Sequence, residues 1–161
     1  MKQHLDSLDK KILQLISADA RIPFLEVARE CNVSGAAIHQ RVQKLTQMGV
    51  IKGSQFVLNP ENMGFQTTAF IGLNLKNPEY FDDAVLALKN IPEVVECHYI
   101  TGNYDLFIKI HAENNNALLK VIHDKLQPLK LSRSETIISF NTEFSRQLSP
   151  DCIETEDEYE E

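Results

Sequence analysis

The sequence predicts an α+β protein made of two small domains. Residues 6–48 repeat apolar side chains at the three- and four-residue spacing of helices, whereas residues 65–142 alternate strand and helix patterns. Between these regions, NPENMG at 59–64 concentrates residues that favour turns and loops. The expected divisions are a first domain, a linker, a second domain and a tail, at residues 1–58, 59–64, 65–146 and 147–161.

Three helices are expected in the first domain, at residues 6–18, 23–31 and 35–48. Asp6 or Ser7 can cap the start of the first helix and Ser34 that of the third, while Gly49 suits a helix end. The inward side chains are expected to be Leu8, Ile12, Leu15 and Ile16, then Leu25, Ala28 and Cys31, then Ile38, Val42 (or Arg41), Leu45 and Met48.

The second and third helices fit a helix-turn-helix arrangement. Ala28 is the small residue that this geometry needs early, and Asn32 tolerates the left-handed backbone of a tight turn. VIKGSQFVLN at 50–59 then predicts a small β-hairpin, or wing, around Lys52-Gly53-Ser54. The first domain is therefore predicted to be a winged helix-turn-helix.

The second domain is predicted to have a ferredoxin-like βαββαβ order. Its strands are expected at 65–75, 94–101, 105–112 and 132–142, and its helices at 78–91 and 114–127. Such a sheet carries helices on one face only. Phe70, Phe107 and either Val95 or Tyr99 are expected on the other face, and an apolar face of this kind predicts self-association.

Charge is distributed unevenly along the chain, whose net charge is −7. Residues 1–60 hold eight Lys/Arg against five Asp/Glu, a balance of +3, whereas residues 151–161 hold seven acidic residues and no basic one. The basic balance of the first domain is compatible with DNA as a partner. The acidic tail is expected to be disordered.

The third helix presents an outer face suited to the major groove of DNA. Its side chains are short, hydrogen-bonding or cationic, and Gln side chains can pair with adenine edges. The predicted DNA-contacting residues are Ser34, Gly35, Ala36, His39, Gln40, Arg41, Gln43 and Lys44, with Lys52 from the wing. The alternative is a three-helix module that contacts protein rather than DNA.

Two separate segments resemble the Lrp/AsnC (feast/famine) family of regulators, and lean toward its asparagine-regulator branch. They are RIPFLEVARECNVSGAAIHQRVQKLTQMGVIKG at 21–53 and CHYITGNYDLFIKI at 97–110, and SRSETIISF at 132–140 is similar to the family's last strand. The resemblance implies a transcription regulator whose dimers assemble further, with octamers expected. It also implies that an amino acid binds between neighbouring dimers and modulates assembly or DNA binding.

The resemblance places the effector near the hairpin that contains Gly102. The matching residues are Thr101, Gly102, Tyr104 and Asp105, with Ser134 and Thr136 on the facing strand. A carboxylate can pair with an amino acid's ammonium, and backbone amides at a glycine turn can receive its carboxylate. The alternative is that Gly102-Asn103 only forms the hairpin and Asp105 only caps a strand end.

Several other classes of protein are not expected. Cys97, His98, His111 and His123 match no zinc spacing, no catalytic motif stands out, and no cofactor is expected. Three widely spaced cysteines, no apolar run long enough for a membrane span and no secretory h-region predict a cytoplasmic protein. The alternative function is an amino-acid-binding oligomer of the ACT type whose helical domain contacts protein.

Overall fold

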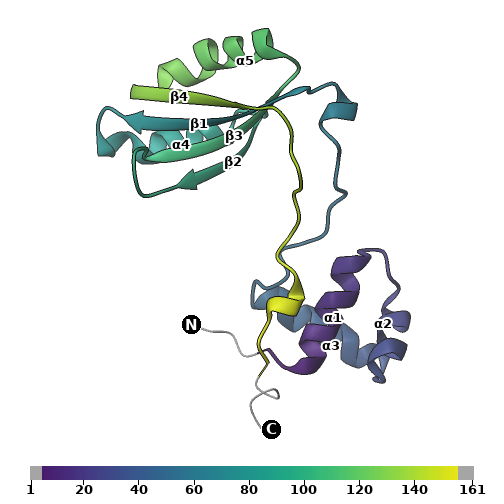
Figure 1. Cartoon of the computed structure of the whole chain (residues 1–161). Helices are drawn as coiled ribbons and strands as arrows, with labels where there is room; N and C mark the ends of the chain where they lie inside the picture. The colour runs from purple at the N-terminus through teal and green to yellow at the C-terminus, as the bar shows by residue number, and fades with distance from the viewer. Residues whose placement is uncertain (1–4, 156–161) are drawn as a thin grey trace. The chain divides into compact units, whose positions relative to one another are not determined.

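The computed structural model describes residues 5–155, which form two compact units (Figure 1). The first unit combines the chain up to Phe56 with the chain from Ser145 onward, and the second is Val57–Phe144. Both ends of the described part of the chain thus belong to one unit. None of the helices in the described part is long and apolar enough to cross a membrane.

The first unit contains the three predicted helices, α1 (Ser7–Ala18), α2 (Phe24–Cys31) and α3 (Gly35–Gln47). Asp6 caps α1 in a capping box with Asp9, and Asn32 ends α2 in the left-handed conformation with φ +54°. The predicted caps and turn are therefore confirmed. The buried core consists of Ile12, Leu13, Val27, Ala28, Ile38 and Leu45.

Two local predictions for this unit are wrong. Leu25 was expected inside, but its side chain is 68% exposed and Val27 takes the buried position on α2. Residues 51–58 form no strand, so the predicted hairpin is absent, and Phe56, Val57 and Leu58 are exposed. A two-stranded hairpin with no further strand or helix against it has little stability of its own.

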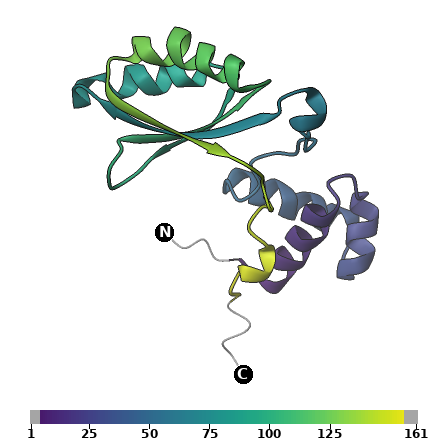
Figure 2. The ribbon, with the colours of Figure 1, turned by 45° about the horizontal axis from the view of Figure 1, so that its top comes forward.

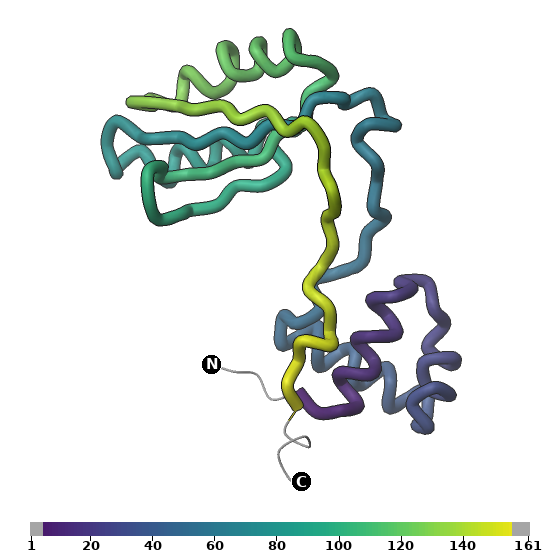
Figure 3. The backbone as a smooth tube through the Cα atoms, viewed as in Figure 1, coloured from purple at the N-terminus to yellow at the C-terminus, as the bar shows by residue number. Residues whose placement is uncertain are grey.

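The described part of the acidic tail is ordered, which corrects the prediction of disorder. A 3-10 turn at Pro150–Cys152 contacts α1, where Gln14 Nε2 donates a hydrogen bond of 2.7 Å to Asp151 Oδ1. Ile153 packs against the helical core and Thr155 is 1% exposed. The returning segment is visible beside α1 in Figure 3. Residues 156–161, to which the same prediction applied, lie outside the described residues.

The second unit has the predicted βαββαβ order. Its elements are β1 (Thr67–Leu75), α4 (Phe81–Lys89), β2 (Val94–Tyr99), β3 (Leu106–Ala112), α5 (Asn115–Val121) and β4 (Leu131–Ser139). The four strands lie in the order β2-β3-β1-β4, and every neighbouring pair is antiparallel. Both helices cover the same face of the sheet (Figure 2).

The two faces of this sheet differ as the alternation predicted. Ala69, Ile71 and Leu73 of β1 are buried in the core with residues of α4 and α5. On the opposite side, which we term the open face, the rings of Phe70 and Phe107 stack with centroids 6.0 Å apart. Tyr99 does not belong there: its ring meets that of Phe81, the first residue of α4, at 5.0 Å.

Candidate functional site

The outer surface of α3 carries most of the predicted DNA-contacting residues. Ser34, Ala36, His39, Gln40, Gln43 and Lys44 are exposed, Gly35 is partly buried, and Lys52 is exposed after the helix. Ser34 Oγ also accepts a hydrogen bond from the Ala37 amide at 3.2 Å, so this residue caps the helix. His39 is held by an edge-to-face contact with Phe24 of α2, with ring centroids 4.7 Å apart.

Arg41 does not belong to this outer surface. Its Nη1 donates to Asp6, and also to Asp9 Oδ1 at 3.0 Å, and the Asp9 side chain is 1% exposed. The hydrogen bond to Asp6 raises the pKa of Arg41. Burial favours a neutral Asp6, but hydrogen bonds from Arg41 and from the Asp9 amide outweigh it and lower the pKa of Asp6. Arg41 therefore joins α3 to the start of α1.

The loop between β2 and β3 places Tyr104 on the open face. Gly102 turns the chain with φ +110°, which favours glycine. The Tyr104 ring then lies directly over Gly72, where a β-carbon would come within 2.5 Å of the ring. The Tyr104 hydroxyl donates to Glu135 Oε2 at 2.6 Å, and this hydrogen bond raises the pKa of Tyr104.

Asp105 is tied to the end of β1. Its Oδ2 accepts from the Leu75 amide at 2.8 Å, and its own amide donates to the Leu73 carbonyl at 3.0 Å. These bonds match the strand-end role that was the alternative for this residue. Within residues 5–155, the other carboxylate oxygen, Oδ1, accepts no hydrogen bond from the protein, which leaves it open to an ammonium group.

The remaining predicted effector residues are not brought together with Tyr104. Ser134 pairs with Leu73 and Thr136 with Ile71, so both point to the helix-covered side of the sheet, where β4 leaves them exposed. Glu135, between them, points to the open face and meets Tyr104. Sequence reasoning missed Glu135, although alternation along 133–139 separates it from its neighbours. Thr101 and Gly102 are exposed in the loop.

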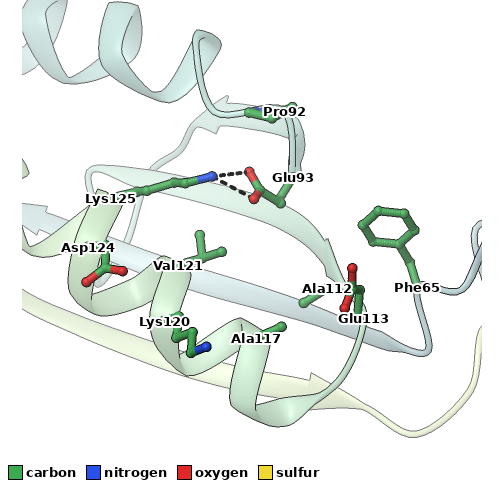
Figure 4. Close-up of a pocket in the computed structure, with 10 residues that line it drawn as sticks. All are labelled: Phe65, Pro92, Glu93, Ala112, Glu113, Ala117, Lys120, Val121, Asp124 and Lys125. Atoms are coloured by element: carbon green, nitrogen blue, oxygen red, sulfur yellow. Dashed lines mark hydrogen bonds and ion pairs between the residues drawn. The ribbon is translucent and has the colours of Figure 1, made fainter.

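A separate pocket of about 410 Å³ lies beside α5 (Figure 4). Ala112, Ala117 and Val121 form part of an apolar lining, and charged side chains surround it. Lys125 Nζ contacts Glu93 Oε1 at 2.6 Å and Oε2 at 2.8 Å, so the ammonium and the carboxylate are already paired with each other. Burial favours a neutral Glu93, but this pairing lowers its pKa. No residue of the pocket belongs to the predicted effector set.

The described residues also bear on metal binding and on the cysteines. Among residues 5–155, no group of three or more His, Cys, Asp or Glu side chains could hold a metal ion. Cys31, Cys97 and Cys152 are all free, and burial raises the pKa of the Cys31 and Cys97 thiols. A raised thiol pKa disfavours the reactive thiolate.

Comparisons with known proteins match both units. The profile described as winged helix-turn-helix DNA-binding matches residues 5–52, and the Lrp/AsnC ligand binding domain matches residues 68–148. Regulatory protein AsnC of Haemophilus influenzae is 36% identical over 148 residues, which cover 91% of this chain and 99% of that protein. The match to the winged helix-turn-helix DNA-binding profile favours DNA over protein as the partner of the helical unit.

Solved structures agree with this assignment. The structure of Escherichia coli AsnC aligns with a TM-score of 0.86 at 33% identity, covering 92% of this chain and all of that one. The leucine response regulatory protein of Mycobacterium tuberculosis aligns with a TM-score of 0.81 at 28% identity, covering 91% of this chain and 100% of the other. The chain therefore belongs to the Lrp/AsnC family, as a DNA-binding transcription regulator with a ligand-binding domain and not an enzyme.

Proposed function

We propose that α3 reads DNA in the major groove through its exposed outer residues. The supporting observation is a continuous row of short polar and cationic side chains on one helix that begins with a capped, accessible N-terminus. The proposed contacts are Ser34, Gly35, Ala36, His39, Gln40, Gln43 and Lys44, with Lys52 near the phosphates. Arg41 is left out because its guanidinium is engaged with Asp6 and Asp9.

We further propose that two copies associate through the open face and that such dimers assemble further, up to octamers. Phe70 and Phe107 stack there, and Ile137 of β4 is 50% exposed on the same side. Covering these apolar groups removes them from water, which favours association. Because the protein is a DNA-binding regulator similar to one of the bacterium Haemophilus influenzae, we also propose that it acts in the cytoplasm.

The effector, proposed to be an amino acid, would bind where copies of the chain meet. Tyr104 lies on one face of the sheet while Ser134 and Thr136 point to the other. One chain cannot wrap these groups around one small molecule, whereas residues from two chains can. Binding between copies would then shift assembly, and with it the arrangement of recognition helices on DNA.

Light scattering after size-exclusion chromatography tests assembly and sensing together, with and without each standard amino acid. We expect an oligomer whose mass changes with at least one amino acid. Thr136→Val replaces a hydroxyl by a methyl group of similar size and should weaken the binding of that amino acid, measured by calorimetry. Ser17→Ala, in the other unit, should leave the binding unchanged. A protein that stays monomeric and binds no amino acid would refute this proposal.

DNA binding is tested separately by titrating salt. Affinity for a duplex selected from a random pool should fall steeply with salt, because phosphate contacts release counterions. Lys44→Ala should reduce both the affinity and the salt slope. A DNA affinity that does not change with salt concentration would contradict the proposal that this surface contacts phosphates.

A further inference from the structure

Leu25 is an apolar side chain that the packing of the first unit leaves in water. It is 68% exposed, whereas Val27 and Ala28, later on the same helix, are buried. A single exposed leucine is ordinary on most surfaces and needs no explanation. Its position beside the proposed DNA-reading surface is what distinguishes Leu25.

Leu25 lies against the start of the recognition helix. Its Cδ2 atom is 3.4 Å from the point where a β-carbon on Gly35, the first residue of α3, would stand. The preceding residue, Phe24, makes the edge-to-face contact with His39. The first turn of α2 and the first two turns of α3 therefore form one continuous surface.

This surface combines polar groups with a small apolar patch. Leu25 and the exposed Ala36 provide the apolar part beside Ser34 and Gln40. In helix-turn-helix complexes the N-terminal residues of the recognition helix contact base edges, and the preceding helix crosses the phosphate backbone. In a complex of that geometry, a side chain at the junction of these helices faces the rim of the major groove.

We propose that Leu25 contacts the 5-methyl group of a thymine and so contributes to operator choice. The thymine methyl is the apolar group that base edges present in the major groove. A leucine already in contact with the helix that enters the groove can cover this methyl without reorganising the fold. The proposal rests on the proposed DNA-reading function and adds a specificity-determining residue outside α3.

Replacing thymine by deoxyuridine isolates this contact, because the two bases differ by one methyl group. The full-length protein is first used to select duplexes from a random pool. The selected duplex is then synthesised with deoxyuridine at one thymine at a time, and its affinity is measured by fluorescence anisotropy. At one thymine in each half-site, wild type should lose about fourfold in affinity, the effect of one buried methyl-sized group.

Variants assign that loss to Leu25. Leu25→Ala should bind the thymine and deoxyuridine duplexes equally, whereas Leu25→Met, which keeps an apolar side chain of similar length, should retain a preference for thymine. Leu86→Ala is the matched control, because Leu86 is 61% exposed on α4 in the other unit, and it should behave as wild type. Thermal melting of each variant verifies that the helical unit remains folded.

Two results would overturn the assignment. The first is an unchanged thymine preference in Leu25→Ala, and a loss of that preference in Ala36→Gly would then assign the methyl contact to Ala36. The second is a wild-type protein whose affinity for a tightly bound duplex is unchanged by every deoxyuridine substitution. A pool that yields no enriched sequence would instead refute the DNA-reading function on which the assignment depends.

Discussion

Replacing Arg41 by alanine should destabilise the helical unit rather than remove a DNA contact. The Asp9 side chain is 1% exposed and Arg41 Nη1 lies 3.0 Å from it, while the Arg41 side chain is 30% exposed. Removing one partner of a fully buried ion pair costs about 3–5 kcal/mol. Water reaches Arg41 and Asp6 and screens their charges. We therefore expect Arg41→Ala to lower the free energy of unfolding by about 2–3 kcal/mol.

Thermal unfolding followed by circular dichroism measures this loss. For a unit of this size, about 2–3 kcal/mol corresponds to a Tm lower by roughly 10–20 °C. Hydrogen exchange should show the loss of protection in α1 and α3 rather than in the sheet. Lys44→Ala is the matched control on the same helix: Lys44 is exposed, so its Tm should stay close to wild type while DNA affinity falls.

The sign of the pH dependence follows from Asp6. Its pKa in the folded protein is below the ordinary value of 3.8, so the pair contributes fully above pH 3.8. This stabilisation is lost as the pH falls through the lower, folded pKa. The difference in Tm between wild type and Arg41→Ala should therefore be constant near neutrality and shrink below pH 3.8.

Below its Tm, Arg41→Ala should bind DNA within a few-fold of wild type. A variant that melts like wild type but loses DNA affinity as Lys44→Ala does would refute the reasoning. Arg41 would then be a DNA contact, as its place on α3 first indicated. A gap in Tm that does not change on acidification would refute the part assigned to Asp6.

Three other changes have defined outcomes. Gly72→Ala puts a β-carbon 2.5 Å from the Tyr104 ring and should displace that ring, which near-UV circular dichroism would detect; unchanged spectra would show that the ring does not lie there. Glu135→Gln should lower the pKa of Tyr104 toward its ordinary value, measured by ultraviolet titration of the phenol with Tyr104→Phe as the reference. Ile153→Ala should destabilise the helical unit by about 1–3 kcal/mol in denaturant unfolding monitored by hydrogen exchange of α1, and an unaffected unit would mean that the C-terminal return contributes nothing.

Much of the fold could be predicted because local patterns and the final packing agree. The period of two along 67–75 separates buried Ile71 from Phe70 on the open face, and the structure keeps that separation. Asn32 and the caps at Asp6 and Ser34 act through neighbouring residues, so the sequence alone indicates them.

The predictions from sequence are wrong where tertiary contacts determine the position of a side chain. Periodicity places Leu25 on an inward stripe, but a short helix can rotate slightly about its axis and bury Val27 instead. An arginine on an outer helix face looks like a phosphate ligand unless the position of Asp9 is known. Composition marks the C-terminal segment as acidic and hides the contribution of Ile153, which packs against the helical core.

The candidate site could be predicted only in part, for the same reason. The α3 surface follows from helix periodicity, so most of its residues are exposed as expected. The groups that surround an effector depend on which face of the sheet each side chain occupies. Ser134 and Tyr104 occupy opposite faces. A motif gives the order of residues along the chain but not the side of the sheet.

The return of the C-terminal segment to α1 makes the ligand-binding domain an insertion within the DNA-binding domain. Two stretches of main chain join the domains, one before β1 and one after β4, instead of a single tether. A domain joined by one segment of main chain can rotate about that segment, whereas a second connecting segment limits the rotation. Residues 140–149 alone separate the end of β4 from the turn on α1, so the core of the helical unit is completed by chain that follows the ligand-binding domain.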